Sequence, residues 1–265
     1  MIRQVPHREP QQEPPLEPDA PRHPCEVIPG DPARGLVLAC DHASNFVPAD
    51  IDLGLPQAEF ARHIAYDIGA AGVTRLLARA LDVPAVLTNF SRLIIDPNRG
   101  RADPTLVMRL SDGAVVPGNA RIDEAGKAAR IARFYDPFDE GIAQALAAAE
   151  SAGRVPALVT IHSFTPYWRG VPRPWHVGIL YDRDERLARR LIEALAADPA
   201  GLVVGDNDPY GGGLPGDTID RHATVRGLPN ALIEIRQDLI AGEDDQREWA
   251  DRFARILSPL MERPL

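Results

Sequence analysis

Short apolar runs, almost free of polar residues, alternate along this chain with longer stretches rich in Ala, Leu and Arg. The run 35-GLVLAC-40 is the clearest of them. Such runs are typical of strands that are covered on both faces of a sheet. Strands that alternate with helices indicate an α/β fold. We therefore predict a three-layer α/β fold, in which a mixed or mostly parallel sheet carries helices on both faces.

The same pattern places the individual elements. Strands are expected at 35–40, 84–90, 91–96 (a third strand or a continuation of the second), 156–164, 176–182, 202–205 and 231–236. Helices are expected at 57–81, at 123–152 with an interruption at Pro137, at 184–198, shortly after Asp217, and at 243–262.

The first 33 residues have a different composition from the rest. They are rich in Pro, Glu, Arg and Gln and nearly free of aromatic residues. A segment of this kind buries too little apolar surface to offset the entropy lost on ordering. We predict a disordered or loosely draped arm over residues 1–33 and a single α/β domain over residues 34–265.

Composition narrows the class of partner and the compartment. The 265 residues carry a net charge of -9 and have a pI near 5.3, which argues against nucleic acid as a partner. No apolar run is long enough to span a bilayer, and the opening MIRQVPHREP lacks the apolar segment of a secretory signal. Two cysteines do not make a disulfide framework. We expect a cytoplasmic protein that acts on a small molecule; its oligomeric state is not predicted.

Two histidines, His42 and His162, stand where predicted buried strands end. Ligands gather at the carboxyl ends of strands in open α/β sheets, so both imidazoles are expected above the same edge. A single histidine there would more often be a packed core or loop residue, but two at equivalent positions favour a shared role. Two neutral imidazoles and one carboxylate form a zinc site with an open fourth position. We predict one Zn²⁺ per chain.

The third ligand must be a carboxylate, and Asp67, Asp41 and Asp96 are the candidates. We favour Asp67, because it lies inside the predicted helix 57–81, where an aspartate is unfavourable and needs a reason. A partly exposed or salt-bridged Asp67 is the alternative. His63, one turn earlier, is the second choice, either as a support for Asp67 or as a ligand.

Glu234 interrupts the apolar run 231-ALIEIR-236. Apolar neighbours on both sides predict a partly desolvated carboxyl group, and desolvation raises the pKa of a carboxyl toward the range useful for general acid or base catalysis. A solvated strand face is the alternative, since Arg236 two residues later points the same way.

The segment 96-DPNR-99 follows an apolar run and carries an amide and a guanidinium on a turn that Pro97 braces. On its own this segment reads as a plain surface turn. Beside a metal site, however, Asn98 and Arg99 could bind a substrate carboxylate, since arginine binds carboxylates in a bidentate manner.

Over roughly residues 36–260 the chain resembles the N-formylglutamate amidohydrolase family. The resemblance rests on five segments in the same order: 41-DHASNFVP-48, 67-DIGA-70, 91-SRLIIDPNR-99, 162-HSFTP-166 and 217-DTIDRHATVRGLPNALIEIRQDLI-240. That family is distantly similar to zinc carboxypeptidases and aspartoacylases, so a zinc-peptidase-like fold and hydrolysis of an N-acyl, N-formylglutamate-type amide are implied.

The resemblance implies zinc ligation by His42 and His162, a carboxylate clamp of Asn98 and Arg99, and acid/base catalysis by Glu234. With Asp67 as the third ligand, we further expect Arg92 to stabilise the oxyanion. Contacts to a second substrate carboxylate are expected from Arg221 and His222, with surface ion pairing as an equal alternative for Arg221.

One position departs from the carboxypeptidase-like pattern. Asn45 stands where H-x-x-E would place a metal-binding glutamate, and an amide is a poor zinc ligand. This departure keeps open a non-catalytic binder of N-acyl amino acids. A zinc amidase or peptidase with a different N-acyl substrate is a further alternative.

Three other chemistries are weaker readings of the sequence. The stretch 211-GGGLPG-216 matches a dinucleotide fingerprint, but Pro215 breaks the required turn into a helix, so we expect a mobile loop over the site. No G-x-S-x-G is present for a serine hydrolase. Cys40 lies inside an apolar strand, which favours a buried core residue over a nucleophile.

Overall fold

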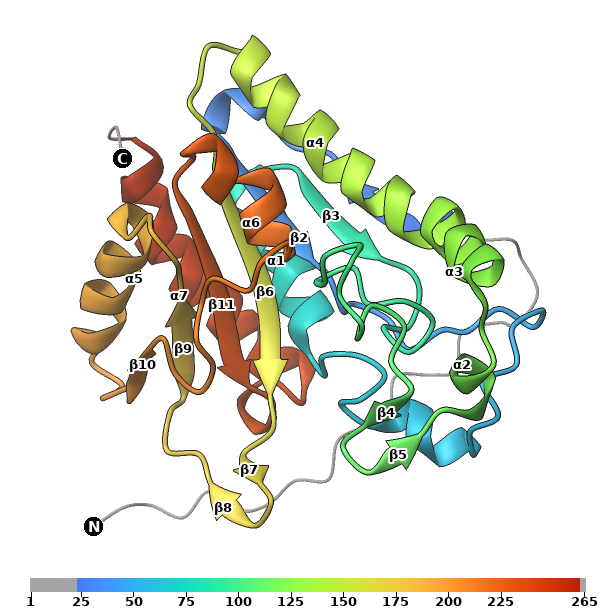
Figure 1. Cartoon of the computed structure of the whole chain (residues 1–265). Coiled ribbons are helices and arrows are strands. Elements are labelled where there is room, and N and C mark those ends of the chain that lie inside the picture. The colour runs from blue at the N-terminus through green and yellow to red at the C-terminus, as the bar shows by residue number, and fades with distance from the viewer. Residues whose placement is uncertain (1–22, 263–265) are drawn as a thin grey trace.

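A computed structural model describes residues 23–262, which are built around a seven-stranded sheet (Figure 1). In spatial order its strands are β1 (Cys25–Ile28), β3 (Ala85–Thr88), β2 (Leu36–Cys40), β6 (Ala157–Phe164), β11 (Asn230–Arg236), β9 (Val177–Leu180) and β10 (Val204–Asp206). Two small hairpins stand apart from it, formed by β4 (Leu110–Ser111) with β5 (Ala114–Val115) and by β7 (Tyr167–Trp168) with β8 (Val171–Pro172).

The sheet is mixed. Its centre is parallel, because β3, β2, β6 and β11 all run in the same direction. The strand β1 joins β3 in the antiparallel sense, and β9 joins β11 likewise. Every residue of β2, β3, β6 and β9 is buried, as expected for strands covered on both sides.

Helices cover both faces of the sheet. On one face, α1 (Ala70–Leu81), α5 (Arg186–Ala196) and α7 (Glu243–Met261) pack against side chains of the central strands. On the other face lie α4 (Asp136–Ser151) and the short α6 (Thr218–His222). Figure 1 shows α6 in front of the sheet and α7 behind it. The predicted three-layer α/β architecture is confirmed.

A third apolar cluster lies beside the sheet and supports irregular chain. Its residues come mainly from the segments that follow β2 and β3, and include the fully buried Leu93, Ile94 and Ile95. Two short helices, α2 (Pro117–Ala120) and α3 (Glu124–Arg130), connect this region to α4. The cluster gives the loops at the carboxyl ends of β2 and β3 a rigid backing, and those loops carry the polar residues discussed below.

The first strand lies within the segment that we expected to be an arm. Cys25–Ile28 pairs with Ala85–Thr88, so the ordered part of the chain begins before residue 34. A buried Cys25 and Ile28 anchor this edge strand, while Val27 is 57% exposed. Residues 1–22 of the predicted arm lie outside the described residues. A single domain over 34–265 remains a prediction.

Two predicted elements differ from the structure. The helix expected over 57–81 begins only at Ala70, after a short 3₁₀ turn at Gln57–Ala61. Gly69 precedes it with a φ of +82°, and a Cβ there would lie 2.2 Å from the Ile240 carbonyl oxygen. The strand expected at 91–96 is a series of turns.

The long helical segment is interrupted close to the predicted point. A π-helical turn at Ile131–Tyr135 joins α3 to α4, and Pro137 lies in the first turn of α4. The backbone is helical on both sides of this proline, so its missing N–H falls where the π turn already changes the helical hydrogen-bond pattern.

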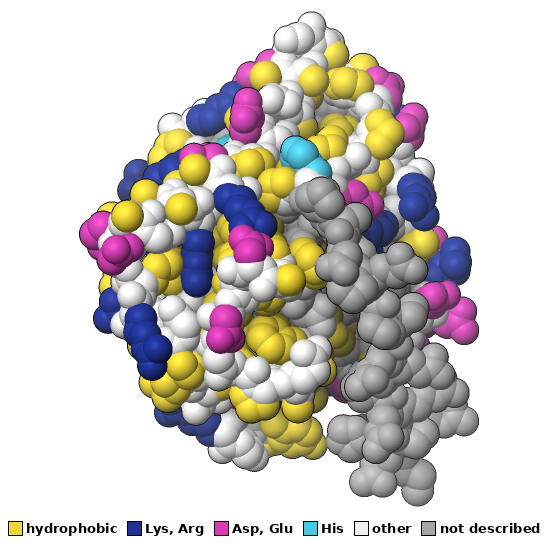
Figure 2. Space-filling view, turned by 90° about the vertical axis from the view of Figure 1, so that its right-hand side faces the viewer, with side chains coloured by type: hydrophobic (Ala, Val, Ile, Leu, Met, Phe, Trp, Pro, Cys, Tyr) yellow, Lys and Arg dark blue, Asp and Glu magenta, His cyan; other side chains and the backbone are white. Residues whose placement is uncertain are grey.

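Charged side chains of both signs lie on the surface. On the face shown in Figure 2, Lys and Arg side chains are interspersed with Asp and Glu. Within residues 23–262, no helix combines the length and the apolar character needed to cross a membrane. Both cysteines are free and buried, and burial raises the pKa of the Cys40 thiol, which disfavours a thiolate nucleophile.

Candidate metal centre

Three polar side chains meet at the carboxyl ends of β2 and β6, which are neighbouring parallel strands. His42 lies in the turn that leaves β2, and His162 lies near the end of β6. Asp67 lies in the turn before α1, where its backbone N–H donates to the carbonyl of His42 (2.9 Å). We call His42, Asp67 and His162 the metal cluster.

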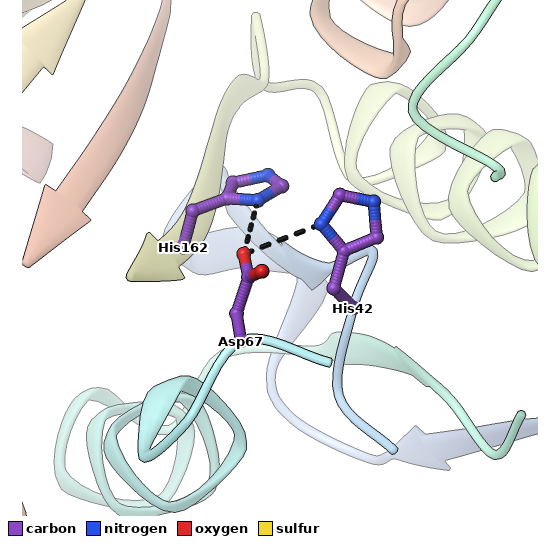
Figure 3. Close-up of side chains that lie close together, drawn as sticks. All are labelled: His42, Asp67 and His162. Atoms are coloured by element: carbon purple, nitrogen blue, oxygen red, sulfur yellow. Dashed lines mark hydrogen bonds and ion pairs between the residues drawn. The ribbon is translucent and has the colours of Figure 1, made fainter. Parts of the chain in front are cut away.

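The metal cluster is compact and closed to solvent. The Nδ1 atoms of His42 and His162 lie 3.2 Å and 2.8 Å from the same oxygen, Oδ2 of Asp67 (Figure 3). One candidate ligand atom from each of the three residues lies within 4.8 Å of the others. Each residue is at most 5% exposed. Two ring nitrogens and one carboxylate therefore face a common point.

Each imidazole contacts a second carboxylate through its other ring nitrogen, Nε2. Asp96 Oδ1 lies 2.7 Å from Nε2 of His42, and Asp41 Oδ2 lies 3.0 Å from Nε2 of His162. The other oxygen of Asp41 accepts a hydrogen bond from the Thr218 hydroxyl of α6. Asp41 and Asp96, the alternative third ligands, thus occupy the far sides of the rings and leave Nδ1 of each ring directed at Asp67.

This arrangement fits a zinc ion. Zinc is commonly bound by two histidines and one carboxylate, and the ring nitrogen that does not bind metal usually contacts a carboxylate or a carbonyl. Both features are present here, from residues far apart in the chain. Although burial opposes the shift, ion pairing with Asp41 and Asp67 raises the pKa of His162 well above its usual value. The cluster is therefore an environment that stabilises a cation.

Glu234 lies beside the metal cluster. It is paired across the sheet with His162, is 8% exposed, and its Oε2 has no hydrogen-bond partner among the described residues. Burial raises the pKa of Glu234 to about 7. The expected desolvation of this carboxyl group is thus present, and its pKa suits proton transfer near neutral pH.

Arg92 contacts the carboxylates around the cluster. Its Nη2 donates to Asp96 (2.7 Å) and its Nη1 lies 3.4 Å from Asp67. The buried Nε has no hydrogen-bond partner among residues 23–262. One donor of this buried cation is therefore unpaired in the described part of the chain.

The DPNR segment forms a tight turn against α6. Asp96 accepts a hydrogen bond from the backbone N–H of Asn98 (2.9 Å), and the side-chain carbonyl of Asn98 accepts one from Thr218 N–H (3.1 Å). That second bond orients the amide so that its amino group is left as a donor. Arg99 donates to the carbonyl of Asn98 (3.0 Å) and forms no ion pair with the described part of the chain.

Arg221 and His222 do not join the metal cluster. Asp139 of α4 accepts from Arg221 Nε (2.9 Å) and lies 2.7 Å from His222 Nε2. Arg221 also donates to the carbonyls of Pro97 (3.1 Å) and Gly216. These contacts are the ion pairing that the sequence left as the alternative for Arg221, and they occupy donors that a substrate would need.

His63, the second-choice ligand, and Asn45, which replaces the expected glutamate, both lie outside the metal cluster. His63 Nε2 lies 3.3 Å from the carboxylate of Asp112, outside the metal cluster. The Asn45 amide donates to the carbonyl of Phe60 (2.9 Å), so it supports a loop. Asp67, the carboxylate of the metal cluster, lies in a turn and not in the helix interior that was predicted.

The glycine-rich stretch 211–216 has a packing role. A Cβ on Gly216 would lie 2.7 Å from Cα of Gly100, next to the DPNR turn. No helix begins at these glycines, since α6 starts at Thr218, so the dinucleotide reading has no structural support. Thr218, which contacts both Asp41 and Asn98, was missed in the sequence; its position as the first residue of a capped helix was the available signal.

Comparisons with known proteins agree with this architecture. A gene product of Agrobacterium tumefaciens with a crystal structure is 38% identical, with a TM-score of 0.80 over 91% of this chain and 94% of that one. An N-formylglutamate amidohydrolase from Ralstonia eutropha JMP134 has the same fold, with 20% identity and a TM-score of 0.67 over 91% of this chain and 98% of that one. No curated protein matches.

The family comparison covers most of the described domain. The sequence model of the N-formylglutamate amidohydrolases matches residues 34–241, a span that contains the metal cluster, the DPNR turn and Glu234. The chain therefore belongs to the N-formylglutamate amidohydrolase family, a family of hydrolases.

Proposed function

We propose that this protein is a zinc-dependent amidohydrolase that cleaves the N-acyl amide, with N-formyl as the favoured acyl group, of an acidic amino acid such as N-formylglutamate. The observation that carries the proposal is the convergence of two imidazole Nδ1 atoms on one oxygen of Asp67, beside the unpaired carboxyl oxygen of Glu234. Membership of the N-formylglutamate amidohydrolase family supports the substrate class.

His42, Asp67 and His162 would hold the metal. When bound there, zinc supplies a Lewis acid that lowers the pKa of water and polarises a carbonyl group. Asp96 and Asp41 fix the two imidazole rings through their Nε2 atoms, so that the Nδ1 atoms stay directed toward Asp67, where the metal would be held.

Glu234 moves the protons. It accepts a proton from the water that attacks the acyl carbon, and it then delivers that proton to the amide nitrogen as the C–N bond breaks. A pKa of about 7 lets the same carboxyl group act in both directions near neutral pH. With an N-formyl substrate, water and the amide yield formate and the free amino acid.

Two arginines have separate roles in the reaction. Arg92, which contacts Asp67 through Nη1 and has an unpaired Nε, stabilises the negative charge that develops on the acyl oxygen. Arg99, with the amino group of Asn98, binds the carboxylate next to the amide that is cleaved. This binding would orient the acyl carbon over the metal cluster.

Metal analysis coupled to an amidase assay tests the proposal. We expect one zinc per chain, formate release from N-formylglutamate, and a loss of roughly 100-fold or more on chelation that added zinc reverses. Asp67→Ala should lose both metal and activity, whereas Asp251→Ala, at an exposed position of α7, should lose neither.

Other outcomes separate the alternatives. Stoichiometric zinc with turnover of a different N-acyl amino acid would retain the chemistry and change the substrate. The alternative outcome is a chain that binds dicarboxylates, does not bind zinc and turns over no N-acyl amino acid. Such a chain would be the non-catalytic binder and would refute the proposal.

A further inference from the structure

A substrate derived from an acidic amino acid carries two carboxylates, and Arg99 can bind only one of them. Arg221 was the sequence candidate for the second, but its donors are used by Asp139 and by main-chain carbonyls. Arg92 is paired with Asp67 and Asp96. A cation for the second carboxylate must therefore come from another part of the site.

Arg173 is a buried cation without a carboxylate partner. It is 9% exposed, yet its guanidinium forms no ion pair with any acidic side chain among residues 23–262. Its polar contacts are the Tyr210 hydroxyl (2.9 Å) and the carbonyl and hydroxyl of Thr165 (3.4 and 3.5 Å). A buried charge is costly unless it is paired, so an arginine held in this way indicates a site for an anion.

Three aromatic rings hold this guanidinium in place. Its central carbon lies 5.6 Å from the ring centre of Phe164, 5.2 Å from that of Trp168 and 5.0 Å from that of Tyr210. Stacking on aromatic faces fixes the plane of an arginine and leaves its N–H edge free for bidentate binding of a carboxylate. The cage therefore orients Arg173 without neutralising it.

The cage lies next to the reaction centre. Phe164 is two residues beyond His162 in β6, so both side chains are on the same face, about 7 Å apart along the strand. Glu234 is opposite His162 in β11, and on its other side it is opposite Gly178 of β9. A Cβ on Gly178 would lie 1.9 Å from the carbonyl oxygen of Asp208, so the segment that leads to Tyr210 packs directly beside Glu234.

The charge of Glu234 affects the ionisation of the Tyr210 hydroxyl. Burial of the hydroxyl and then the negative charge of Glu234 raise the pKa of Tyr210. The Tyr210 residue is 41% exposed, while its hydroxyl contacts the buried Arg173. Tyr210 thus connects the aromatic cage with the catalytic edge of the sheet.

We propose that Arg173, assisted by Tyr210, binds the side-chain carboxylate of the substrate and sets the preference for an acidic amino acid. This inference rests on the proposed amidohydrolase function. In the complex the carboxylate takes up the free N–H edge of Arg173 and accepts a hydrogen bond from the Tyr210 hydroxyl, while Asn98 and Arg99 hold the carboxylate next to the amide.

The test compares N-formylglutamate with N-formylglutamine, which has the same shape and a neutral side chain. We expect the wild-type protein to prefer the glutamate substrate in kcat/KM by roughly 100-fold. Arg173→Met should reduce this preference to about threefold or less, through loss on the glutamate substrate, since only the charged side chain loses a partner. Tyr210→Phe should lower the preference by a smaller factor, about tenfold, because this substitution removes one hydrogen bond and keeps the ring.

Arg169→Met is the matched control. Arg169 is in the same hairpin segment and its guanidinium lies 5.7 Å from the Trp168 ring, but it is exposed. Its replacement should leave the substrate preference unchanged. An unchanged preference in Arg173→Met, with turnover retained, would overturn the inference and leave the proposed function intact.

Calorimetric binding of glutarate and of butyrate to the zinc-loaded protein gives a readout besides turnover. Glutarate should bind more tightly to the wild-type protein, and Arg173→Met should remove that difference. If Arg173→Met does not fold, Tyr210→Phe and Arg173→Lys carry the same comparison. Absence of turnover on every N-acyl amino acid would refute the proposed function, whereas equal binding of the two acids by the wild-type protein would refute the role of Arg173.

Discussion

The metal cluster and the contact between α4 and α6 contain the same types of residue, but the hydrogen-bond partners of their charged groups differ. In the second group, which we call the α4–α6 cluster, Asp139 is shared by Arg221 and His222. These partners outweigh the effect of burial and lower the pKa of Asp139 to about 2. Around the metal cluster, by contrast, Glu234 Oε2 and Arg92 Nε have no hydrogen-bond partner within the described residues.

This difference separates groups that hold the fold from groups that can react. A carboxylate with several donors is fixed in its charged form and has little capacity left for proton transfer. A buried carboxyl with an unpaired oxygen has a raised pKa, and it gains partners when a substrate or water arrives. The contrast predicts that substitutions at the two clusters affect different properties, activity in one and stability in the other.

The largest effect is expected at Glu234. Glu234→Gln keeps the shape of the side chain but cannot accept a proton, so kcat should fall by roughly 10²–10⁴-fold. Stability should be unchanged or higher, because the variant no longer buries an ionisable carboxyl. Steady-state kinetics and thermal unfolding measure the two effects.

Two further measurements make this result specific. Zinc content should remain at one per chain, since Glu234 is outside the metal cluster. Glu193→Gln, at an exposed position of α5, should leave kcat unchanged. Loss of stability together with a normal kcat in Glu234→Gln would place Glu234 with the α4–α6 cluster and remove the contrast.

The parts of the fold that could be predicted are those where burial is uniform. Strands β2, β3 and β6 are buried throughout, so most of their residues are apolar and the strands can be recognised as apolar runs. The strand β1 is an edge strand with an exposed Val27, and only its pairing with β3 reveals it. The helix over 57–81 was overextended because Phe60 and Ile64 pack in the third apolar cluster, whereas Leu76 packs against the sheet.

The site shows a similar division. His42 and His162 could be selected from strand ends alone, and Asp67 from an acidic residue in apolar surroundings; the structure brings all three together. The partners of Arg221 could not be foreseen, because Asp139 comes from a helix about 80 residues earlier. Arg173 was missed for the same reason, since the rings around it come from β6, a hairpin and the loop before α6.

Asp139→Asn tests the other side of the contrast. The folded-state pKa is about 2 and the usual value is 3.8, so the carboxylate stabilises the fold above pH 4, and this contribution is lost as pH falls toward 2. We expect the variant to lose about 2 kcal/mol of unfolding free energy at pH 7, with a smaller change in kcat than in Glu234→Gln. Urea unfolding at pH 7 measures the loss.

Asp136→Asn is the control in the same helix. Its ion pair with Arg101 (2.7 Å) is about half exposed, so its loss should change stability by less than about 0.5 kcal/mol. If Asp139→Asn were as stable as the wild-type protein but inactive, the α4–α6 cluster would belong to the reaction machinery.

The smallest effect is expected at Asp217, where the two clusters meet. Asp217 caps α6, which carries Thr218 toward Asp41 and Arg221 toward Asp139. Burial raises its pKa from the usual 3.8 to about 6, so the ionised form destabilises the fold; this penalty develops as pH rises from about 4 to 6 and is complete above pH 6. Asp217→Asn keeps the hydrogen bond to the N–H of Asp220 and removes the charge.

The variant should therefore be more stable than the wild-type protein by roughly 1 kcal/mol at pH 8, and the difference should vanish near pH 4, where the wild-type carboxyl is protonated. Thermal unfolding at the two pH values measures it. If the gain in stability comes with a lower kcat, the charge at Asp217 serves the metal cluster at the expense of the fold. If stability falls at both pH values, the carboxylate of Asp217 behaves like that of Asp139 and is fixed in its charged form by its donors. Asp217 would then belong with the α4–α6 cluster and would have no role at the metal cluster.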